Sequence, residues 1–190
     1  MTLLFASSNT HKIQEMRELC EPDLDILSAG EAGFLEPVEE SGHTFVENAR
    51  VKARAIWQRS YGQDTFADDS GLSCRTLRGE PGIYSARYAG TGNSQDNIDL
   101  LLANMEGKKD RFATFICVIC LAKGDSEYYF EGRVDGEISF TIQGQDGFGY
   151  DPVFIPGGHD RSFAQMDARE KNLISHRAIA VRKLKAFLTA

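Results

Sequence analysis

An almost unbroken apolar run in the middle of the chain, RFATFICVICLA, constrains the fold most strongly, because it predicts a strand buried at the centre of a sheet over residues 112–122. Cys117 and Cys120 lie within this run at C-x-x-C spacing, and residues three apart on a strand point to opposite faces. No second C-x-x-C and no His pair accompanies them in the sequence. We therefore predict buried structural cysteines rather than a disulfide framework, a redox pair or a zinc site.

Patterns on both sides of this run predict four helices with recognisable starts. The opening TLLFAS predicts a buried strand over about residues 2–6, and Asn9 then caps a helix. Thr44 and Glu47 form a T-x-x-E capping box, and Ser94 and Ser175 are the predicted caps of two later helices. The predicted apolar faces comprise Ile13, Met16, Leu19 and Cys20; Val46, Ala49, Ala53 and Ile56; Ile98, Leu101, Leu102 and Met105; and Ile179, Leu184, Phe187 and Leu188.

Further strands are expected between the helices. SEYYFEGRV and GEISFTI predict two neighbouring antiparallel strands joined by a hairpin turn at Asp135-Gly136. Helices near both ends and strands in the middle predict an α/β domain with a mixed sheet. With 190 residues, 42% of them hydrophobic, and no linker or repeat, we expect one domain over residues 1–190.

The overall charge restricts the partners of the chain. A net charge of −7 argues against binding of a nucleic-acid polymer. The first residues carry no early positive charge, and their apolar run is too short for a signal or membrane segment, so we expect a cytoplasmic protein with no membrane partner. A polyanionic small molecule would need local basic groups, which Lys12, Lys171, His176 and Arg177 supply.

Two adjacent carboxylates, Asp68 and Asp69, follow an apolar run in the string FADDSGL. Neighbouring carboxylates repel each other, so folding them together usually requires a cation or a proton. A strand end followed by glycine is a favourable place for chemistry. Taken alone, the string is equally compatible with a polar turn or a helix cap.

Two loops have features of a ligand site. SSNTHK lies between a predicted strand and a predicted helix, where free backbone N–H groups and Lys12 favour phosphate, although such turns often bind nothing. GQDGFGYDPVF is rich in glycine and offers the flat faces of Phe148 and Tyr150 for stacking on a base. The alternative for the second loop is an aromatic anchor with a turn at Asp151-Pro152.

Charged groups elsewhere allow two interpretations. The acidic loop EPVEESG, which contains Glu36, Glu39 and Glu40, is either a solvated surface or a source of metal ligands. His176 and Arg177 open the last predicted helix, where they either bind an anion or form a basic pair on a solvated surface. Glu47 is predicted to be structural because it belongs to the capping box.

Six motifs in one order resemble the inosine triphosphate pyrophosphatase family, also called noncanonical purine NTP or dITP/XTP pyrophosphatases. They are SSNTHK, TFVENARVKA, FADDSGL, GEPGIYSARYAG, GFGYDPVF and EKNLISHRAIA, and the resemblance extends from Leu4 to about Leu188. It implies an elongated mixed β-sheet flanked by helices, with two lobes and an active-site cleft between them. It also implies hydrolysis of ITP, dITP and XTP between the α and β phosphates, which yields a nucleoside monophosphate and pyrophosphate.

The resemblance also assigns residues. Asp69 matches the family's catalytic acidic residue, which is a proton acceptor and metal ligand, and Ser70 matches a substrate contact. A glutamate before the second helix is the family's other metal ligand, and we choose Glu39 over Glu40. The remaining substrate contacts implied in this way are Ser7, Ser8, Asn9, Thr10, His11, Lys12, Phe148, Gly149, Tyr150, Asp151, Lys171, His176 and Arg177. The resemblance further suggests a homodimer, with Tyr84 and Tyr88 as interface candidates.

The assigned residues form a coherent chemical hypothesis. Asp69 and a glutamate would hold Mg²⁺ through oxygen ligands, and Asp69, or Asp68 beside it, would accept the proton of the attacking water. Lys12 and Lys171 would stabilise the polyphosphate. Donors at His176 and Arg177 would meet the 6-oxo group of hypoxanthine or xanthine, which adenine lacks.

The same motifs are compatible with two competing functions. One is a related phosphatase acting on modified nucleotides or other phosphate esters, which would use the same carboxylates and metal. The other is a nucleotide-binding protein that has lost catalysis. Release of pyrophosphate from ITP, without turnover of ATP, separates the predicted enzyme from both.

Overall fold

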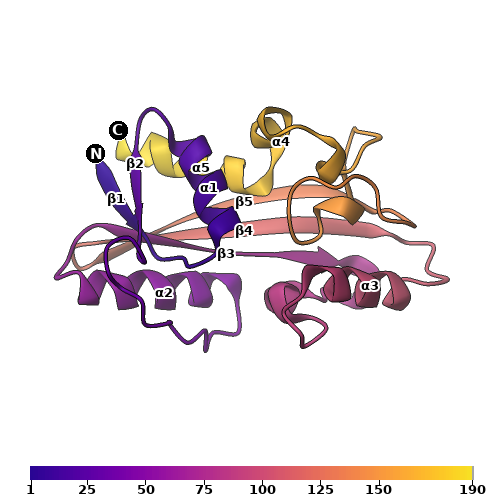
Figure 1. The fold of residues 1–190 in the computed structure, drawn as a ribbon, viewed down its shortest axis with the longest axis horizontal. Helices are drawn as coiled ribbons and strands as arrows, with labels where there is room; N and C mark the ends of the chain where they lie inside the picture. Colours follow the sequence, from indigo (N-terminus) through magenta and orange to yellow (C-terminus); the bar gives the residue numbers. More distant parts are fainter. Residues whose placement is uncertain (190) are drawn as a thin grey trace. The chain divides into compact units, whose positions relative to one another are not determined.

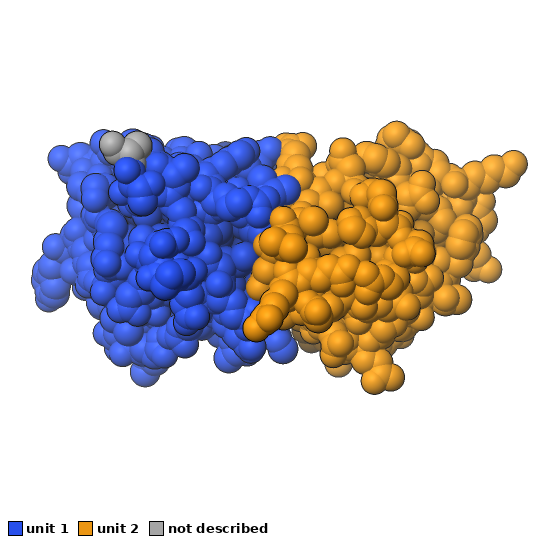
Figure 2. All heavy atoms as spheres, turned by 90° about the horizontal axis from the view of Figure 1, so that it is seen from above, with its two compact units in different colours: residues 1–69, 117–132, 177–190 blue, residues 70–116, 133–176 orange. Residues whose placement is uncertain are grey.

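The computed structural model describes residues 1–189 and divides the chain into two compact units (Figure 2). Unit 1 comprises residues 1–69, 117–132 and 177–190, and unit 2 comprises residues 70–116 and 133–176. No helix among the described residues is long and apolar enough to cross a membrane.

The strands form a mixed sheet with the order β2-β1-β3-β4-β5-β6. Its strands are β1 (Thr2–Phe5), β2 (Asp25–Ser28), β3 (Thr65–Cys74), β4 (Phe112–Lys123), β5 (Ser126–Ile138) and β6 (Phe154–Pro156). β1 is parallel to both β2 and β3, with Phe5 opposite Phe66, whereas β5 and β6 are antiparallel. The predicted α/β class with a mixed sheet flanked by helices is therefore confirmed.

In unit 1, helices cover both faces of the sheet (Figure 1). α1 (Thr10–Cys20) and α5 (His176–Leu188) lie on one face, and α2 (Phe45–Arg59) lies on the other. The main apolar cluster of this unit joins Leu3 and Phe5 of β1 to Met16 of α1 and Leu184 of α5. The predicted apolar face of α2 is correct at Ala49, Ala53 and Ile56 but wrong at Val46, which is 41% exposed.

Unit 2 contains the helices α3 (Ser94–Asn104) and the short α4 (Ala168–Ile174). A second apolar cluster joins residues of α3 to residues of the strands. Phe115 of β4 contacts the rings of Phe154 and Phe163 in this cluster. Ile98 and Leu101 of α3 are buried there, as their helical spacing predicts.

The apolar run that forms β4 is buried as predicted. Cys117 and Cys120 are both buried thiols that form no disulfide within the described residues. Burial raises the pKa of the Cys120 thiol to about 12, which makes it a poor nucleophile and a poor metal ligand near neutral pH. The structural interpretation of this C-x-x-C pair therefore agrees with its surroundings.

Helix caps agree with the sequence at two helices and differ at one. The Asn9 side chain accepts a hydrogen bond from the backbone N–H of Lys12, and Glu47 accepts one from the backbone N–H of His43. Ser94 is wrong as a cap, because Asn93 supplies the capping oxygen and Ser94 is the first helical residue. Ser175 follows the last residue of α4 and directly precedes α5.

The predicted hairpin turn at Asp135-Gly136 is wrong, because both residues lie inside the continuous strand β5. The chain turns instead at Gly124 and Asp125, where Gly124 has a φ of +56°. Gly136 is opposite Pro156, and a Cβ there would lie 2.2 Å from the carbonyl oxygen of Ile155. This glycine therefore permits close approach of β6 rather than a change of direction.

We expect Gly136→Ala to lower the free energy of unfolding by about 1–3 kcal/mol, because the new methyl group would force β5 and β6 apart. Gly30→Ala is the matched control, since a Cβ at Gly30 meets nothing within 4 Å. Urea denaturation of both variants measures the difference. Equal stability of the two variants would contradict the close approach of these strands.

Candidate active site

The adjacent carboxylates lie within strand β3 and not at its end. Asp68 and Asp69 are 2% and 6% exposed, and β3 continues to Cys74, so the alternative of a polar turn is wrong. Consecutive side chains on a strand point to opposite faces. Asp68 therefore contacts residues of α1 and α5, whereas Asp69 contacts residues of α2.

Asp68 belongs to a buried network of two acids and two bases. Its carboxylate lies 3.1 Å from Lys12 Nζ and 3.0 Å from Nη2 of Arg177. Nη1 of Arg177 donates to the carboxylate of Glu15, a buried residue of α1. Burial opposes the charge of Arg177, but Glu15 and Asp68 outweigh it and raise the pKa of the guanidinium. The solvated-surface alternative is thus wrong for Arg177.

Asp69 belongs to a second network on the opposite face of the strand. Its Oδ1 lies 3.2 Å from Lys52 Nζ, and its Oδ2 accepts a hydrogen bond of 3.2 Å from Nδ2 of Asn48. Lys52 Nζ also lies 2.8 Å from Oε1 of Glu40. Burial raises the pKa of Asp69 above its ordinary value, against the opposing attraction of Lys52 and Lys12. The side chain of Glu40 is partly exposed, with 29% of its surface accessible to solvent.

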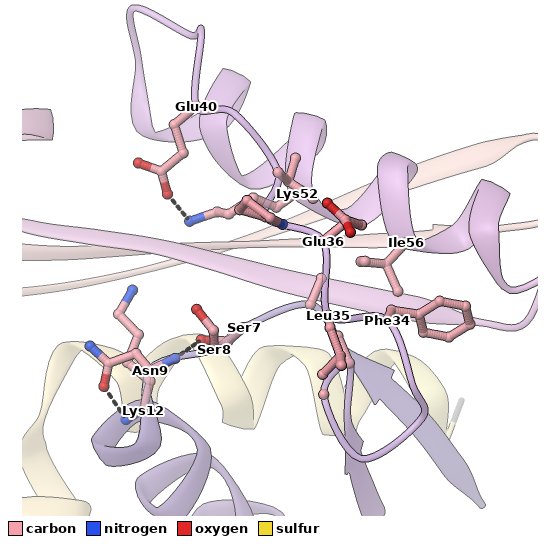
Figure 3. Close-up of a pocket in the computed structure, with 15 residues that line it drawn as sticks. Ser7, Ser8, Asn9, Lys12, Phe34, Leu35, Glu36, Glu40, Lys52 and Ile56 are labelled. Carbon is pink, nitrogen blue, oxygen red and sulfur yellow. Dashed lines mark hydrogen bonds and ion pairs between the residues drawn. The ribbon is translucent and has the colours of Figure 1, made fainter.

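A cavity of about 330 Å³ in unit 1 lies beside these networks (Figure 3). The polar part of its lining contains the loop before α1, and Figure 3 shows the ion pair between Glu40 and Lys52. The lining residues most relevant to binding are Ser7, Ser8, Asn9, Lys12, Glu36, Glu40 and Lys52, with Phe34, Leu35, Val38 and Ile56 as an apolar wall. Thr10 and His11 are exposed in the first turn of α1.

The residues around Asp69 fit a hard divalent cation. Two carboxylates, from Asp69 and Glu40, already share one positive group, the ammonium of Lys52. Oxygen ligands of this type suit Mg²⁺. Within residues 1–189, no group of three or more His, Cys, Asp or Glu side chains is placed to hold a metal.

The contacts distinguish the two glutamates considered from the sequence. Glu39 is exposed and lies outside the cavity lining, whereas Glu40 lines the cavity and shares Lys52 with Asp69. The geometry therefore supports Glu40, although Glu39 was the choice from sequence. The sequence does not distinguish these neighbouring acids, because the fold of the loop decides which of them faces Lys52.

In unit 2, the segment from Phe148 to Asp151 is organised around a buried acid. Asp151 Oδ2 accepts hydrogen bonds from Lys171 Nζ at 2.7 Å and from the backbone N–H of Phe148 at 2.8 Å. A Cβ at Gly147 would lie 2.2 Å from the same oxygen, which explains the glycine before Phe148. Lys171 Nζ also lies 5.0 Å from the centre of the partly exposed Phe148 ring.

Two other residues of unit 2 differ from their predicted settings. Tyr150 is only 4% exposed, and its hydroxyl donates to the carbonyl of Ser85, so its ring is part of the core and not an open stacking face. His176 is also buried and stacks on Phe115 at 4.6 Å between ring centres. The solvated-surface alternative is wrong for His176 as well. Ser70 is partly exposed, and Gly149 has a φ of +60°.

Three contributors to these networks were missed in the sequence: Glu15, Asn48 and Lys52. The spacing within α2 could have indicated two of them, because Asn48 and Lys52 are four residues apart and therefore share one helical face. Glu15 likewise lies three residues after Lys12 in α1. The sequence does not show which strand those helical faces meet.

Comparisons with known proteins match the chain over nearly its whole length. A model of the Ham1 family matches residues 3–187. The dITP/XTP pyrophosphatase of Christiangramia forsetii is 43% identical to this chain, and the match covers 100% of both proteins. That of Bacillus subtilis is also 43% identical, and the match covers 98% of this chain and 96% of the relative. The solved Ham1 protein of Staphylococcus aureus superposes with a TM-score of 0.89 at 40% identity, covering 100% of this chain and 98% of that one.

We expect Glu15→Gln to lower the free energy of unfolding by about 1.5–3 kcal/mol, because it weakens a buried hydrogen bond to the charged Arg177. Glu18→Gln changes an exposed acid of the same helix and should shift stability by no more than about 0.5 kcal/mol. Chemical denaturation compares the two. A Glu15 variant as stable as the Glu18 variant would show that the Arg177 network is not a stabilising element.

Proposed function

This chain belongs to the Ham1 family, and from that premise we infer that it hydrolyses noncanonical purine nucleoside triphosphates to the monophosphate and pyrophosphate. It is a nucleoside triphosphate pyrophosphohydrolase, and ITP, dITP and XTP are the proposed substrates. The observation that carries this function is the pair of buried carboxylates, Asp68 and Asp69, each with a lysine partner beside a polar cavity. That arrangement joins cations for a polyphosphate to an acid that can accept a proton.

Lys12 and Lys52 are the groups proposed to bind the polyphosphate in unit 1. Both line the cavity with the loop Ser7–Asn9, which lies at the N-terminus of α1, where the helix dipole favours an anionic group such as phosphate. Each lysine is now paired with an aspartate, so binding would exchange a carboxylate for a phosphate oxygen. Asp68 would keep its charge partner Arg177 during that exchange.

Asp69 and Glu40 are the groups proposed to hold Mg²⁺. Around Asp69, two carboxylates share one lysine, whereas around Asp68 two carboxylates are balanced by Lys12 and Arg177. The two carboxylates that share Lys52 offer anionic oxygen ligands to a divalent cation. When bound, the cation would neutralise charge on phosphate oxygens and lower the pKa of the attacking water.

Asp69 is also the proposed general base. Its burial favours the protonated carboxyl, and Asn48 and Lys52 hold its two oxygens in fixed directions. The carboxylate accepts one proton from water, the water oxygen bonds to phosphorus, and the bond between the α and β phosphates breaks. Lys12 and Lys52 stabilise the charge on the pyrophosphate that leaves.

Base recognition is assigned to residues of unit 2. The partly exposed ring of Phe148 offers a stacking face, and Lys171 and Asp151 beside it provide a donor and an acceptor. His176 is proposed as a donor to the 6-oxo group. A similar role for Arg177 would require its guanidinium to leave Glu15 or Asp68, its partners in unit 1.

The proposal includes a cytoplasmic homodimer that binds neither membrane nor nucleic-acid polymer. The net charge of −7 supports the absence of non-specific binding to polyanions. Tyr84 is 54% exposed and is one candidate for contact between subunits. Light scattering of the purified protein measures the assembly directly.

A panel of nucleoside triphosphates, assayed for pyrophosphate, tests the function. We expect pyrophosphate from ITP, dITP and XTP with Mg²⁺, much less from ATP, and none after chelation by EDTA. Asp69→Asn serves as the inactive control, since loss of a general base lowers the rate by about 10²–10⁴-fold. Orthophosphate as the sole product would replace this proposal with that of a related phosphatase, and binding without turnover would indicate a silent nucleotide-binding protein.

Neighbouring glutamates provide a test of the metal ligand. We expect Glu40→Gln to raise the Mg²⁺ concentration for half-maximal activity and to lower kcat by at least about tenfold, because it removes an anionic ligand. Glu39→Gln changes an exposed acid one residue away and should leave both values near wild type. The opposite pattern would restore Glu39 as the ligand.

A further inference from the structure

We propose that Asn48 is a positioning residue that couples the loop carrying Glu40 to Asp69 and so sets the spacing of the two metal-binding carboxylates. The inference rests on the proposed function, because it concerns the same metal site. Asn48 itself would contact neither metal nor substrate. Its effect would pass through the two groups that its side chain bonds.

The hydrogen bonds of Asn48 determine which way its amide points. Oδ1 accepts from the backbone N–H of Gly42 at 2.9 Å, a role that only the oxygen can fill. Nδ2 must then face Asp69, and it donates to Oδ2 at 3.2 Å. The side chain has no exposed surface, so water does not compete for either bond. One rigid amide therefore connects the loop backbone to the catalytic carboxylate.

Gly42 is placed so that this connection also constrains Glu40. It lies two residues after Glu40, and a Cβ on Gly42 would be 2.6 Å from Asn48 Oδ1 and 2.7 Å from Cβ of Glu47. No side chain can occupy position 42 without moving the loop away from α2. The glycine therefore permits the short contact, and the contact holds Glu40 within reach of Lys52.

The same helical face supplies both connections between Asp69 and the loop. Lys52, one turn after Asn48, joins Asp69 Oδ1 to Glu40, while Asn48 joins Asp69 Oδ2 to Gly42. A bound cation and polyphosphate would compete with Lys52 for these carboxylates. The neutral amide of Asn48 has no such competitor, so it would maintain the arrangement when Lys52 turns to the phosphates.

The test uses Asn48→Leu, which preserves approximate shape but neither donates nor accepts a hydrogen bond. Because groups that orient metal ligands typically contribute 10–100-fold, we expect the Mg²⁺ concentration for half-maximal activity to rise by about that factor. The affinity for Mn²⁺, measured by electron paramagnetic resonance with a nonhydrolysable α,β-methylene analogue of ITP, should fall by a similar factor. Gly42→Ala should reproduce both changes while retaining Asn48.

Asn97→Leu is the matched control. Asn97 is also a buried asparagine that bridges two backbone groups, the N–H of Ala89 and the carbonyl of Ala86, but it belongs to unit 2. Its variant should lose thermal stability without a change in Mg²⁺ requirement or Mn²⁺ affinity. Equal shifts in the two leucine variants, or metal parameters within twofold of wild type in Asn48→Leu and Gly42→Ala, would overturn the positioning role. Absence of pyrophosphate production by the wild type would instead refute the proposed function.

Discussion

The burial of two consecutive carboxylates in one strand is the constraint on which the site depends. Asp68 and Asp69 would repel each other strongly in a medium of low polarity if they shared one environment. Strand β3 separates them because its side chains alternate between faces, and each face then supplies its own cations. The lysines, the arginine and the amide around the site follow from the need to stabilise these two groups.

The two faces of β3 stabilise their carboxylates with different partners, and this difference is the basis of the proposed chemistry. Around Asp68, Lys12 and Arg177 balance two acids, and this network joins α1, β3 and α5. Around Asp69, Lys52 pairs with two acids, and the neutral Asn48 donates a hydrogen bond to Asp69. The first face is therefore suited to stability and to holding Lys12 in place. The second presents two carboxylates that share Lys52, and the proposed metal site and general base rest on this arrangement.

Local patterns were sufficient for much of the fold. The apolar run of β4, the caps at Asn9 and Thr44 and most of the predicted buried helix positions depend on residues close in sequence, and these were confirmed. Val46 and Phe187 are exceptions, because both are exposed. Two of the failures came where a distant segment intervened. Gly136 resembles a turn residue but allows β6 to approach, and Tyr150 resembles a stacking platform but is covered by the core of unit 2.

The sequence by itself determined the family, the class of reaction and the presence of the Asp68-Asp69 pair, since motifs in a defined order preserve the chemical groups of a site. Only the tertiary structure decided how those groups are paired. It placed Arg177 between Glu15 and Asp68, brought Glu40 rather than Glu39 to Lys52, and bonded Asn48 to Asp69. The physical reason is that ion pairs and buried hydrogen bonds act over a few ångströms, and separation along the chain does not reveal which side chains come that close.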